Sequence, residues 1–588
     1  GAAGRHVRNH GTPTSLPWDA AEGVAKPLDA PVTDPALFGN HRVLGAEVRP
    51  AFQVIAERAR QYTPEEVSRI TSIPAATVRR IAREFGAAAR VGATITIDGE
   101  QLPYRPASVT WYRGLSSHKY AFMNGFAAML LQTIIGGLDV PGGLMGYRRA
   151  KYRATEDGLL AAMPHPGRIG SGPGPTNPYP ARVVTPPQSI DLFELFPVAC
   201  YSRAFAVKAI LEPEKYHAHV QPQMLLQRRS NMAYTGAGRE MMTELLCKIP
   251  FIVSFAFEID ETAEFADVVF PDLHYLEQLE PVGEGEYTTG SQPATFYGSK
   301  PVLKPPFDPP WDQLVSHDEI LLELADRAGF LDDVYTACNA LWRLPSDYAL
   351  QPGKRYSFQE LMDRALKATH GADKGLEWYV KDGLAVKERS VRERYPGAYP
   401  KPRIHVYHEY MVDAGRQVEA VTRELGIPWD SSGYVPLAEW RPCPAHTPKA
   451  PDFDLYMITA KAPYHALTAT GSNPLLNEVG SRLGYNEIAL HRDAGKRKGL
   501  KDGDWVEVET DSGKKARGCV KLTSAIHPEV TAVWSSAGRW ARGATQNKEP
   551  RGIHFNSLLT LDDEHMDFVS AAVDSCLRVK ITKLEKKN

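Results

Sequence analysis

A strand–helix–strand pattern in the middle of the chain restricts the fold more than any other feature. Residues 223–227 and 251–257 are short runs of strand character, and the segment 238–247 between them is compatible with a helix. Two neighbouring parallel strands need a crossover of this kind. A third run at 267–271 predicts the next strand. We therefore expect a parallel, doubly wound sheet of the α/β class.

Short strands separated by turns predict a different architecture near the C-terminal end. In AGKRKGLKDGDWVEVETDSG, residues 494–513, a helix-compatible basic run ends at Gly499. Asp502-Gly503 then provides the positive φ of a tight turn. Apolar and polar residues alternate over 505–510, as in a half-buried strand, and a return strand follows. This spacing favours a C-terminal β-barrel.

Helix signals dominate the first part of the chain. Thr63, Pro64 and Glu66 form the pattern of a capped helix start. A second helix is expected after Pro74, because helical spacing continues to residue 85. The remaining expected elements are strands at 91–97 and 107–113, an apolar helix at 122–135 and an amphipathic helix at 316–328.

Composition excludes several classes of function. The 588 residues carry 68 Lys and Arg against 70 Asp and Glu, a net charge of −2, which gives no global electrostatic case for a nucleic-acid partner. No run approaches the roughly 18 apolar residues of a transmembrane helix. The six cysteines are spaced too far apart for any local Cys-x-x-Cys metal or iron–sulfur motif.

Four motifs, in their order along the chain, resemble the large catalytic subunit of the molybdopterin oxidoreductase family, the dimethyl sulfoxide reductase superfamily. The resemblance runs from about residue 45 to the end of the chain. The motifs are TPEEVSRITSIPAATVRRIAREF (63–85), YRGLSSHKYAFMNGFAAMLLQTIIGGLDVPGGLMGYRR (112–149), FAFEIDETAEFADVVFPDLHYLE (255–277) and HFNSLLT (554–560).

The resemblance implies doubly wound α/β domains followed by a C-terminal double-psi β-barrel domain. A Gly- and Pro-rich stretch at 165–180 is expected to form a loop over a functional site. The expected parts are 1–150, the end of the third α/β domain with an extended N-terminal segment; 151–345, the second, dinucleotide-binding α/β domain; 346–450, a connecting segment; and 451–588, the pterin-dinucleotide-binding barrel.

Members of this family hold two molybdopterin guanine dinucleotides and one Mo or W atom, so the resemblance implies the same cofactors here. Anionic dinucleotides are well held by loops at the carboxyl ends of parallel strands. After the strand at 251–257, a carboxylate could pair with a guanine edge, although Asp and Glu at such places are as often helix caps. The residues concerned are Glu258, Asp260, Glu261 and Thr262.

Asn231 stands where the family usually has Gly-x-Asn-Pro, but here the Gly and the Pro are missing. In the barrel, the loop 458–474 resembles the one that covers the second pterin. Lys461 stands there in place of the family's frequent Arg and can neutralise phosphate as a point charge. The other residues that the resemblance assigns to cofactor binding are Tyr464, His465, His554 and Asn556, for which solvated loop or turn positions are the alternative.

Two residues are candidates for a catalytic role. Arg148 follows a glycine loop where the family often has a cation beside the metal, and it could stabilise charge on a substrate oxygen. His118 resembles a position near the family's active-site funnel. The alternatives are a surface charge for Arg148 and a structural histidine for His118. No metal ligand is identified.

The chain also departs from the family. The Cys-rich [4Fe–4S] motif and the segment with the metal ligand are not among these residues, so we expect an N-terminal cluster-bearing segment or subunit to supply them. The resemblance further implies a ferredoxin-like iron–sulfur electron-transfer subunit, and it is compatible with a membrane anchor subunit. It leaves the cellular compartment undetermined.

The resemblance therefore implies a catalytic subunit that performs two-electron redox chemistry or oxygen-atom transfer, as in anaerobic respiration. The run of motifs resembles the polysulfide, thiosulfate, tetrathionate and arsenate reductase branch, and it also resembles relatives that act on aromatic acyl-CoA compounds. Two alternatives stay open: a cofactor-free structural relative within an electron-transfer complex, and a non-redox hydratase on the same cofactor.

Overall fold

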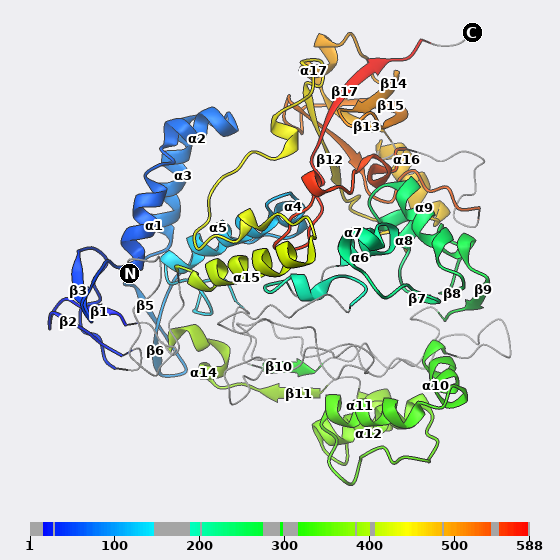
Figure 1. The fold of residues 1–588 in the computed structure, drawn as a ribbon, viewed down its shortest axis with the longest axis horizontal. Helices are drawn as coiled ribbons and strands as arrows, with labels where there is room; N and C mark the ends of the chain where they lie inside the picture. The colour runs from blue at the N-terminus through cyan, green and yellow to red at the C-terminus, as the bar shows by residue number, and fades with distance from the viewer. Residues whose placement is uncertain are drawn as a thin grey trace.

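The computed structural model describes residues 16–27, 30–145, 189–199, 203–273, 294–297, 316–382, 385–399, 406–484, 487–542 and 552–585. Arg148 and the 165–180 loop lie outside these residues. Within the described residues, no helix combines the length and the apolar character needed to cross a bilayer. The barrel lies at one end of the molecule, next to the small parallel sheet, and the N-terminal helices lie on the opposite side (Figure 1).

The predicted α/β sheet is present. Its strands β7 (Leu225–Arg228), β8 (Ile252–Ala256) and β9 (Val268–Pro271) are parallel and adjacent in that order. Helix α9 (Arg239–Lys248) makes the crossover between β7 and β8, and its Leu246 packs with Ile252. Because all three strands run the same way, the loops that follow them gather at one edge of the sheet.

The C-terminal barrel is also confirmed. Six strands close into a barrel in the order β12-β16-β13-β15-β14-β17, with β12 parallel to β16 and β13 parallel to β15. The stretch 494–513 forms the end of a helix, a turn and a strand, as expected. The bounds are β12 Leu455–Ala460, α16 Pro474–Leu483, β13 Ile488–His491, α17 Arg492–Arg497, β14 Trp505–Thr510, β15 Lys515–Thr523, β16 Val530–Trp534 and β17 Leu577–Lys583.

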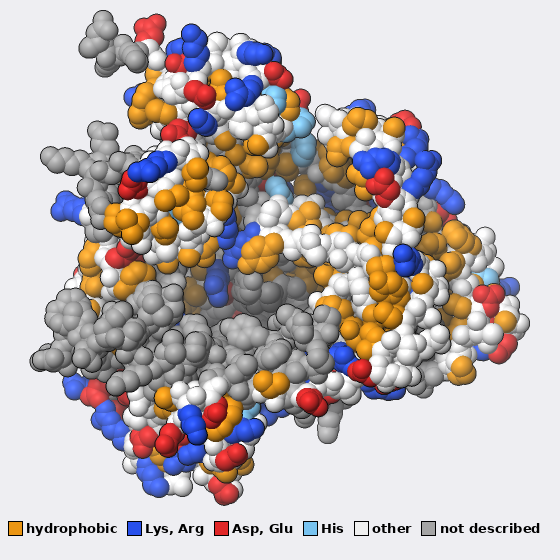
Figure 2. Space-filling view, turned by 180° about the vertical axis from the view of Figure 1, so that it is seen from behind, with side chains coloured by type: hydrophobic (Ala, Val, Ile, Leu, Met, Phe, Trp, Pro, Cys, Tyr) orange, Lys and Arg blue, Asp and Glu red, His pale blue; other side chains and the backbone are white. Residues whose placement is uncertain are grey.

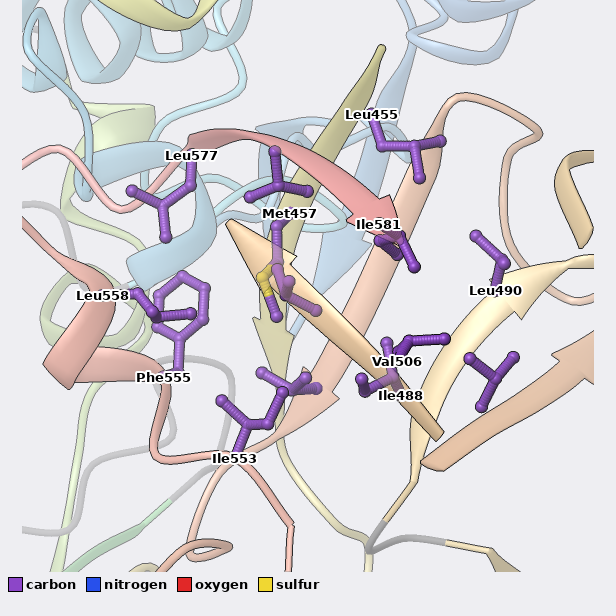
Figure 3. Close-up of a cluster of buried hydrophobic side chains, with 14 of the residues drawn as sticks. Leu455, Met457, Ile488, Leu490, Val506, Ile553, Phe555, Leu558, Leu577 and Ile581 are labelled. Atoms are coloured by element: carbon purple, nitrogen blue, oxygen red, sulfur yellow. The ribbon is translucent and has the colours of Figure 1, made fainter. Parts of the chain in front are cut away.

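One buried apolar cluster fills the barrel. Met457 and Val506 belong to this cluster from two different strands of the wall and are fully buried. Phe555 and Leu558, on the short helix η6 (Phe555–Leu558), insert into the same core (Figure 3). Segment 552–558 is thereby anchored on the barrel, while its His554 and Asn556 reach the α/β domain.

The N-terminal part differs from expectation at one strand. Residues 107–113 are not a strand, because β5 (Thr94–Ile97) pairs instead with β6 (Glu100–Pro103). Asp98 and Gly99 between them both have positive φ, so an Asp-Gly turn closes a tight hairpin. The expected helices are present as α2 Pro64–Thr71, α3 Ala75–Ala88 and α5 Ala121–Ile134; α1 Ala51–Ala59 and α4 Arg113–Ser116 accompany them.

Helices also occupy the range 346–450, for which the Pro-rich sequence predicts only a connecting segment. Helix α15 (Glu409–Leu425) spans 17 residues, and its Met411 and Val418 are fully buried against Val569 from the C-terminal segment. The other helices of this region and its surroundings are α10 His317–Arg327, α11 Leu331–Trp342, α12 Phe358–His370, α13 Leu376–Asp382 and α14 Val391–Arg394.

The remaining elements are short. Helix α6 (Arg203–Leu211) packs beside α9, and α7 (Pro213–Tyr216) packs on α6. Helix α8 (Met232–Thr235) follows β7 directly. Besides the β5–β6 hairpin, the described residues contain three small antiparallel pairs. These are β1 Trp18–Asp19 with β2 Val24–Ala25, β3 His41–Val43 with β4 Ala46–Val48, and β10 Ala294–Tyr297 with β11 Ala385–Glu388.

Candidate functional site

The loops after β7 and β8 meet three barrel loops at one interface. Loops 229–235 and 257–263 come from the carboxyl edge of the sheet, and loops 461–473, 535–542 and 552–557 come from the barrel. Hydrogen bonds between residues up to 322 positions apart in the chain connect them. All ten residues that the sequence assigns to cofactor binding lie on these five loops.

Glu261 is the most constrained of these residues. Its side chain is fully buried, and both carboxylate oxygens accept from Nε of Arg539, at 2.8 and 2.9 Å. The backbone N–H groups of Trp540 (2.9 Å) and Ala541 (3.2 Å) donate to the same carboxylate. Burial alone would raise the pKa of Glu261, but the bonds and charge of Arg539 outweigh it and hold the pKa below its usual value.

Asn231 and Thr262 extend this buried network within the α/β domain. Asn231 Nδ2 donates to Glu261 at 2.7 Å, and its Oδ1 accepts from the Thr262 hydroxyl at 2.9 Å. Thr262 Oγ1 in turn accepts from the N–H of Ala233. Asp260 accepts from the N–H groups of Thr262 and Ala263 at 3.0 and 2.8 Å, the cap-like role weighed as its alternative. Burial raises the pKa of Asp260.

Glu258 is more accessible than Glu261. Its side chain is 19% exposed and lies 3.3 Å from Nη2 of Arg539. It also accepts a hydrogen bond from the Ser472 hydroxyl of the barrel loop. The partners of Glu258 are thus a loop hydroxyl and one terminal nitrogen of a guanidinium. A bound ligand could share these contacts.

His554 is held as a neutral imidazole. Nε2–H donates to the carbonyl of Tyr234 at 2.7 Å, so the lone pair lies on Nδ1, which is buried and has no hydrogen-bond partner among the described residues. The ring lies against Tyr234 and Trp540, with centroids 4.3 and 4.9 Å away. Burial lowers the pKa of His554 to about 4. Nδ1 is thus a fixed acceptor at neutral pH.

Asn556 and the loop 461–473 complete the barrel side. Asn556 Nδ2 donates to the Thr235 carbonyl at 2.8 Å, which ties the barrel to α8. Lys461 is exposed, and the described residues give it no ion pair. His465 Nδ1 lies 3.1 Å from the hydroxyl of Thr470 on the same loop, and burial lowers the pKa of this histidine. Tyr464 lies beside His465, with ring centroids 4.8 Å apart.

Buried polar atoms collect near the carboxyl edge of the sheet. Gln227 Oε1 and Ser254 Oγ lie on neighbouring strands in register, and neither has a hydrogen-bond partner among the described residues. Nη2 of Arg228 is also buried and has no hydrogen-bond partner among the described residues. Buried polar groups of this kind normally have a hydrogen-bond partner.

The face of the molecule opposite to that of Figure 1 is hollowed near its centre, where Lys and Arg side chains are visible (Figure 2).

His118 lies apart from this network. Its Nδ1 is 3.3 Å from the buried carboxylate of Asp574, and its Nε2 is 2.9 Å from the carbonyl of Gly114. The bond to Asp574 raises the pKa of His118. Both ring nitrogens therefore face acceptors within the protein, and His118 connects α4 to the C-terminal segment. These contacts give no support to the predicted catalytic role. The other catalytic candidate, Arg148, lies outside the described residues.

Sequence reasoning missed Arg539, whose side chain links three of the interface loops. It follows β16 in the stretch SSAGRWA, which has no regular periodicity. The glycine before it, Gly538, is the feature of the sequence that could have pointed to this loop. In the structure its φ is +71°, and a Cβ there would lie 2.3 Å from the backbone N of His554. A glycine forced by such a close approach marks the place where two loops cross.

Comparison with known proteins agrees with this geometry. The Molydopterin dinucleotide binding domain matches residues 455–558, which hold strands β12 to β16 of the barrel and its interface loops. Acetylene hydratase from Pelobacter acetylenicus shares the fold, with a TM-score of 0.59 and 16% identity over 91% of this chain and 66% of that one.

Curated relatives are similar over most of the chain. A sulfite dehydrogenase component of Allochromatium vinosum is 24% identical over 92% of this chain and 62% of its own length. The thiosulfate reductase molybdopterin-containing subunit of Salmonella typhimurium is 24% identical over 86% of the chain and 60% of its own length. The arsenate respiratory reductase molybdopterin-containing subunit of Shewanella sp. is 22% identical, over 89% and 61%. The chain thus spans about three-fifths of the length of these relatives, and it carries the dinucleotide-binding domain of molybdopterin oxidoreductases and is similar to their molybdopterin-containing subunits over most of its own length.

Proposed function

We propose that this chain is the dinucleotide-binding part of the catalytic subunit of a Mo or W oxidoreductase. The observation that carries the proposal is the convergence of the sheet's carboxyl-edge loops with three barrel loops at one interface, the barrel loops lying within the region that matches the dinucleotide-binding domain. Two pterin guanine dinucleotides with Mo or W would supply two-electron redox chemistry or oxygen-atom transfer.

The residues present fit such a ligand. Lys461 offers an exposed cation for a phosphate, and His554 Nδ1 offers a buried acceptor for a pterin N–H. Glu258 is the carboxylate best disposed to accept from a guanine edge. Asn231, Asp260, Glu261 and Thr262 would act around the ligand by holding their loops in place, because their polar atoms already bond to other groups of the interface.

We propose oxyanions of sulfur or arsenic as the substrate class. The names of the relatives support it, since they specify sulfite, thiosulfate and arsenate enzymes. An N-terminal cluster-bearing segment or subunit would carry a [4Fe–4S] centre and pass electrons to a ferredoxin-like subunit, with a membrane anchor as a further partner. The relatives' subunit names are consistent with such an assembly.

The test uses this chain produced together with the cluster-bearing segment or subunit proposed above, in a host that makes the pterin cofactor. We expect Mo or W close to one per protein, the fluorescence of oxidised pterin, and dye-coupled turnover of thiosulfate, sulfite or arsenate. Protein without metal or pterin would instead identify the cofactor-free structural relative. Metal and pterin without dye-coupled turnover of these oxyanions, but with addition of water to an unsaturated compound such as acetylene, would identify a hydratase.

A further inference from the structure

Arg539 connects three loops that belong to two domains. Nε bonds to both oxygens of Glu261, Nη2 lies 3.3 Å from Glu258, and Nη1 donates to the carbonyl of Thr468 at 3.0 Å. The side chain is only 4% exposed. Every nitrogen of the guanidinium therefore has an acceptor, and the acceptors come from the α/β loop and from the barrel loop.

The barrel loop is shaped to accept this side chain. At Gly471, an added Cβ would lie 2.8 Å from Nη1 of Arg539, so only a residue without a side chain lets the guanidinium approach. The N–H of Gly471 donates to the carbonyl of Thr468, the same carbonyl that Arg539 binds. The turn 468–471 and the guanidinium thus fit each other closely.

Ser472 makes a second connection between the same two loops. Its hydroxyl donates to Glu258, which Arg539 also approaches. The planar guanidinium has fixed donor directions, whereas an ammonium is a point charge. The separation between loops 258–262 and 468–472 therefore follows from the dimensions of one Arg and one Glu side chain.

We propose that Arg539 is a positioning residue: through its ion pair with Glu261 it fixes the separation of loops 258–262 and 468–472, and this separation sets how tightly the dinucleotide is retained. The part about retention of the dinucleotide rests on the proposed function. The part about the separation of the two loops does not. A shift of about 1 Å in such supporting groups is enough to weaken a site strongly.

The experiment changes the length of the pair while keeping its charge. Glu261→Asp and Arg539→Lys keep the ion pair but alter its reach, and Gly471→Ala displaces the guanidinium without touching either charge. The matched control is Glu507→Asp, which shortens an exposed ion pair with Arg517 on the outside of the barrel. Hydrogen exchange of the amides in 468–472 and the amount of pterin retained after gel filtration are measured for each.

We expect amide exchange in 468–472 to rise about tenfold in all three variants, the ratio that corresponds to loss of one charged hydrogen bond. Retained pterin should fall by a similar factor while the melting temperature of the fold changes little, and the control should match the wild type. A purely structural role would instead lower pterin only in proportion to the folded fraction, which would overturn the proposal.

The readouts separate this proposal from the proposed function. If the wild-type protein holds no pterin, the proposed function is wrong, yet the exchange measurements still decide whether Arg539 holds the two loops. If the wild type holds pterin and none of the three variants accelerates exchange in 468–472, the positioning role is wrong and the proposed function stands.

Discussion

At the scale of single residues, the two best-defined histidines have opposite electrostatic surroundings. His554 is buried without an acidic partner at Nδ1, and its pKa falls to about 4. His118 faces the carboxylate of Asp574, and its pKa rises. Protonation therefore destabilises the folded state at His554 and stabilises it at His118.

His554 should make the protein sensitive to mild acid. Its folded-state pKa is below the ordinary value of 6.5, so the unfolded chain takes up the proton first, and stability falls as the pH drops from 6.5 towards 4. The difference corresponds to about 3 kcal/mol at pH 4. Urea unfolding between pH 7.5 and 4 should show this loss in the wild type and much less of it in His554→Gln. His527→Gln, on an exposed turn, is the control and should behave like the wild type.

His118 should act in the other direction. Because its folded-state pKa is raised, its contribution is fully present below pH 6.5 and is lost as the pH rises through the folded-state pKa. Above pH 6.5, the melting temperature of the wild type should therefore fall with rising pH more steeply than that of His118→Gln. Activity at a fixed pH should change little if connecting α4 to the C-terminal segment is its only role; a loss of turnover without a loss of stability would restore the catalytic assignment.

Lys461 should bind the ligand without supporting the fold. It is exposed and has no ion pair among the described residues, so Lys461→Ala should leave the melting temperature of the cofactor-free protein within a few degrees. Loss of one charged contact to phosphate should weaken retention of the dinucleotide about tenfold. Pterin and metal content against Lys501→Ala, an exposed lysine on a barrel turn, would measure this. Equal pterin in both variants would contradict the prediction.

At the scale of helices and strands, elements with a local cause were predictable. Thr63 accepts from the N–H of Glu66 and begins α2, and the alternation over 505–510 forms β14. The strand expected at 107–113 was wrong, because Asp98-Gly99 closes a hairpin earlier in the chain. Arg539 could not be found this way, since its partners lie 71 to 281 positions away and its own loop has no period.

Gly538 provides a test of the loop crossing. Its positive φ and the 2.3 Å approach of the His554 backbone N to a built Cβ leave no room for a side chain. Gly538→Ala should therefore cost about 2 kcal/mol or more, through backbone strain and displacement of segment 552–557. Thermal unfolding would measure the loss. Gly513→Ala is the control, because its φ is also positive but its Cβ would meet open space.

At the scale of the whole molecule, the barrel is not a separable unit. Leu561, Met566 and Phe568, which precede β17, belong to the apolar cluster around α6. Val569 packs on α15, and Asp567 accepts from the N–H of Phe122 at the start of α5. The C-terminal segment therefore runs from the barrel through the centre of the other domains and back.

Limited proteolysis should reflect this arrangement. A cut within 346–450 should leave the two fragments bound to each other, since the segment 561–571 of the C-terminal fragment fills the core of the N-terminal one. They should co-elute in gel filtration and separate only in denaturant. Release of a free, mostly β C-terminal fragment from the native protein would show that these contacts are weak.

The path of residues 561–575 also has a consequence for synthesis. Asp567 and Phe122, which it binds, are 445 positions apart, so the ribosome releases the helical core long before the segment that completes it. Until that segment emerges, the apolar surface beside α6 has to be shielded by chaperones or by transient contacts within the nascent chain. Any large ligand at the loop interface is therefore loaded late, onto a chain that has just closed.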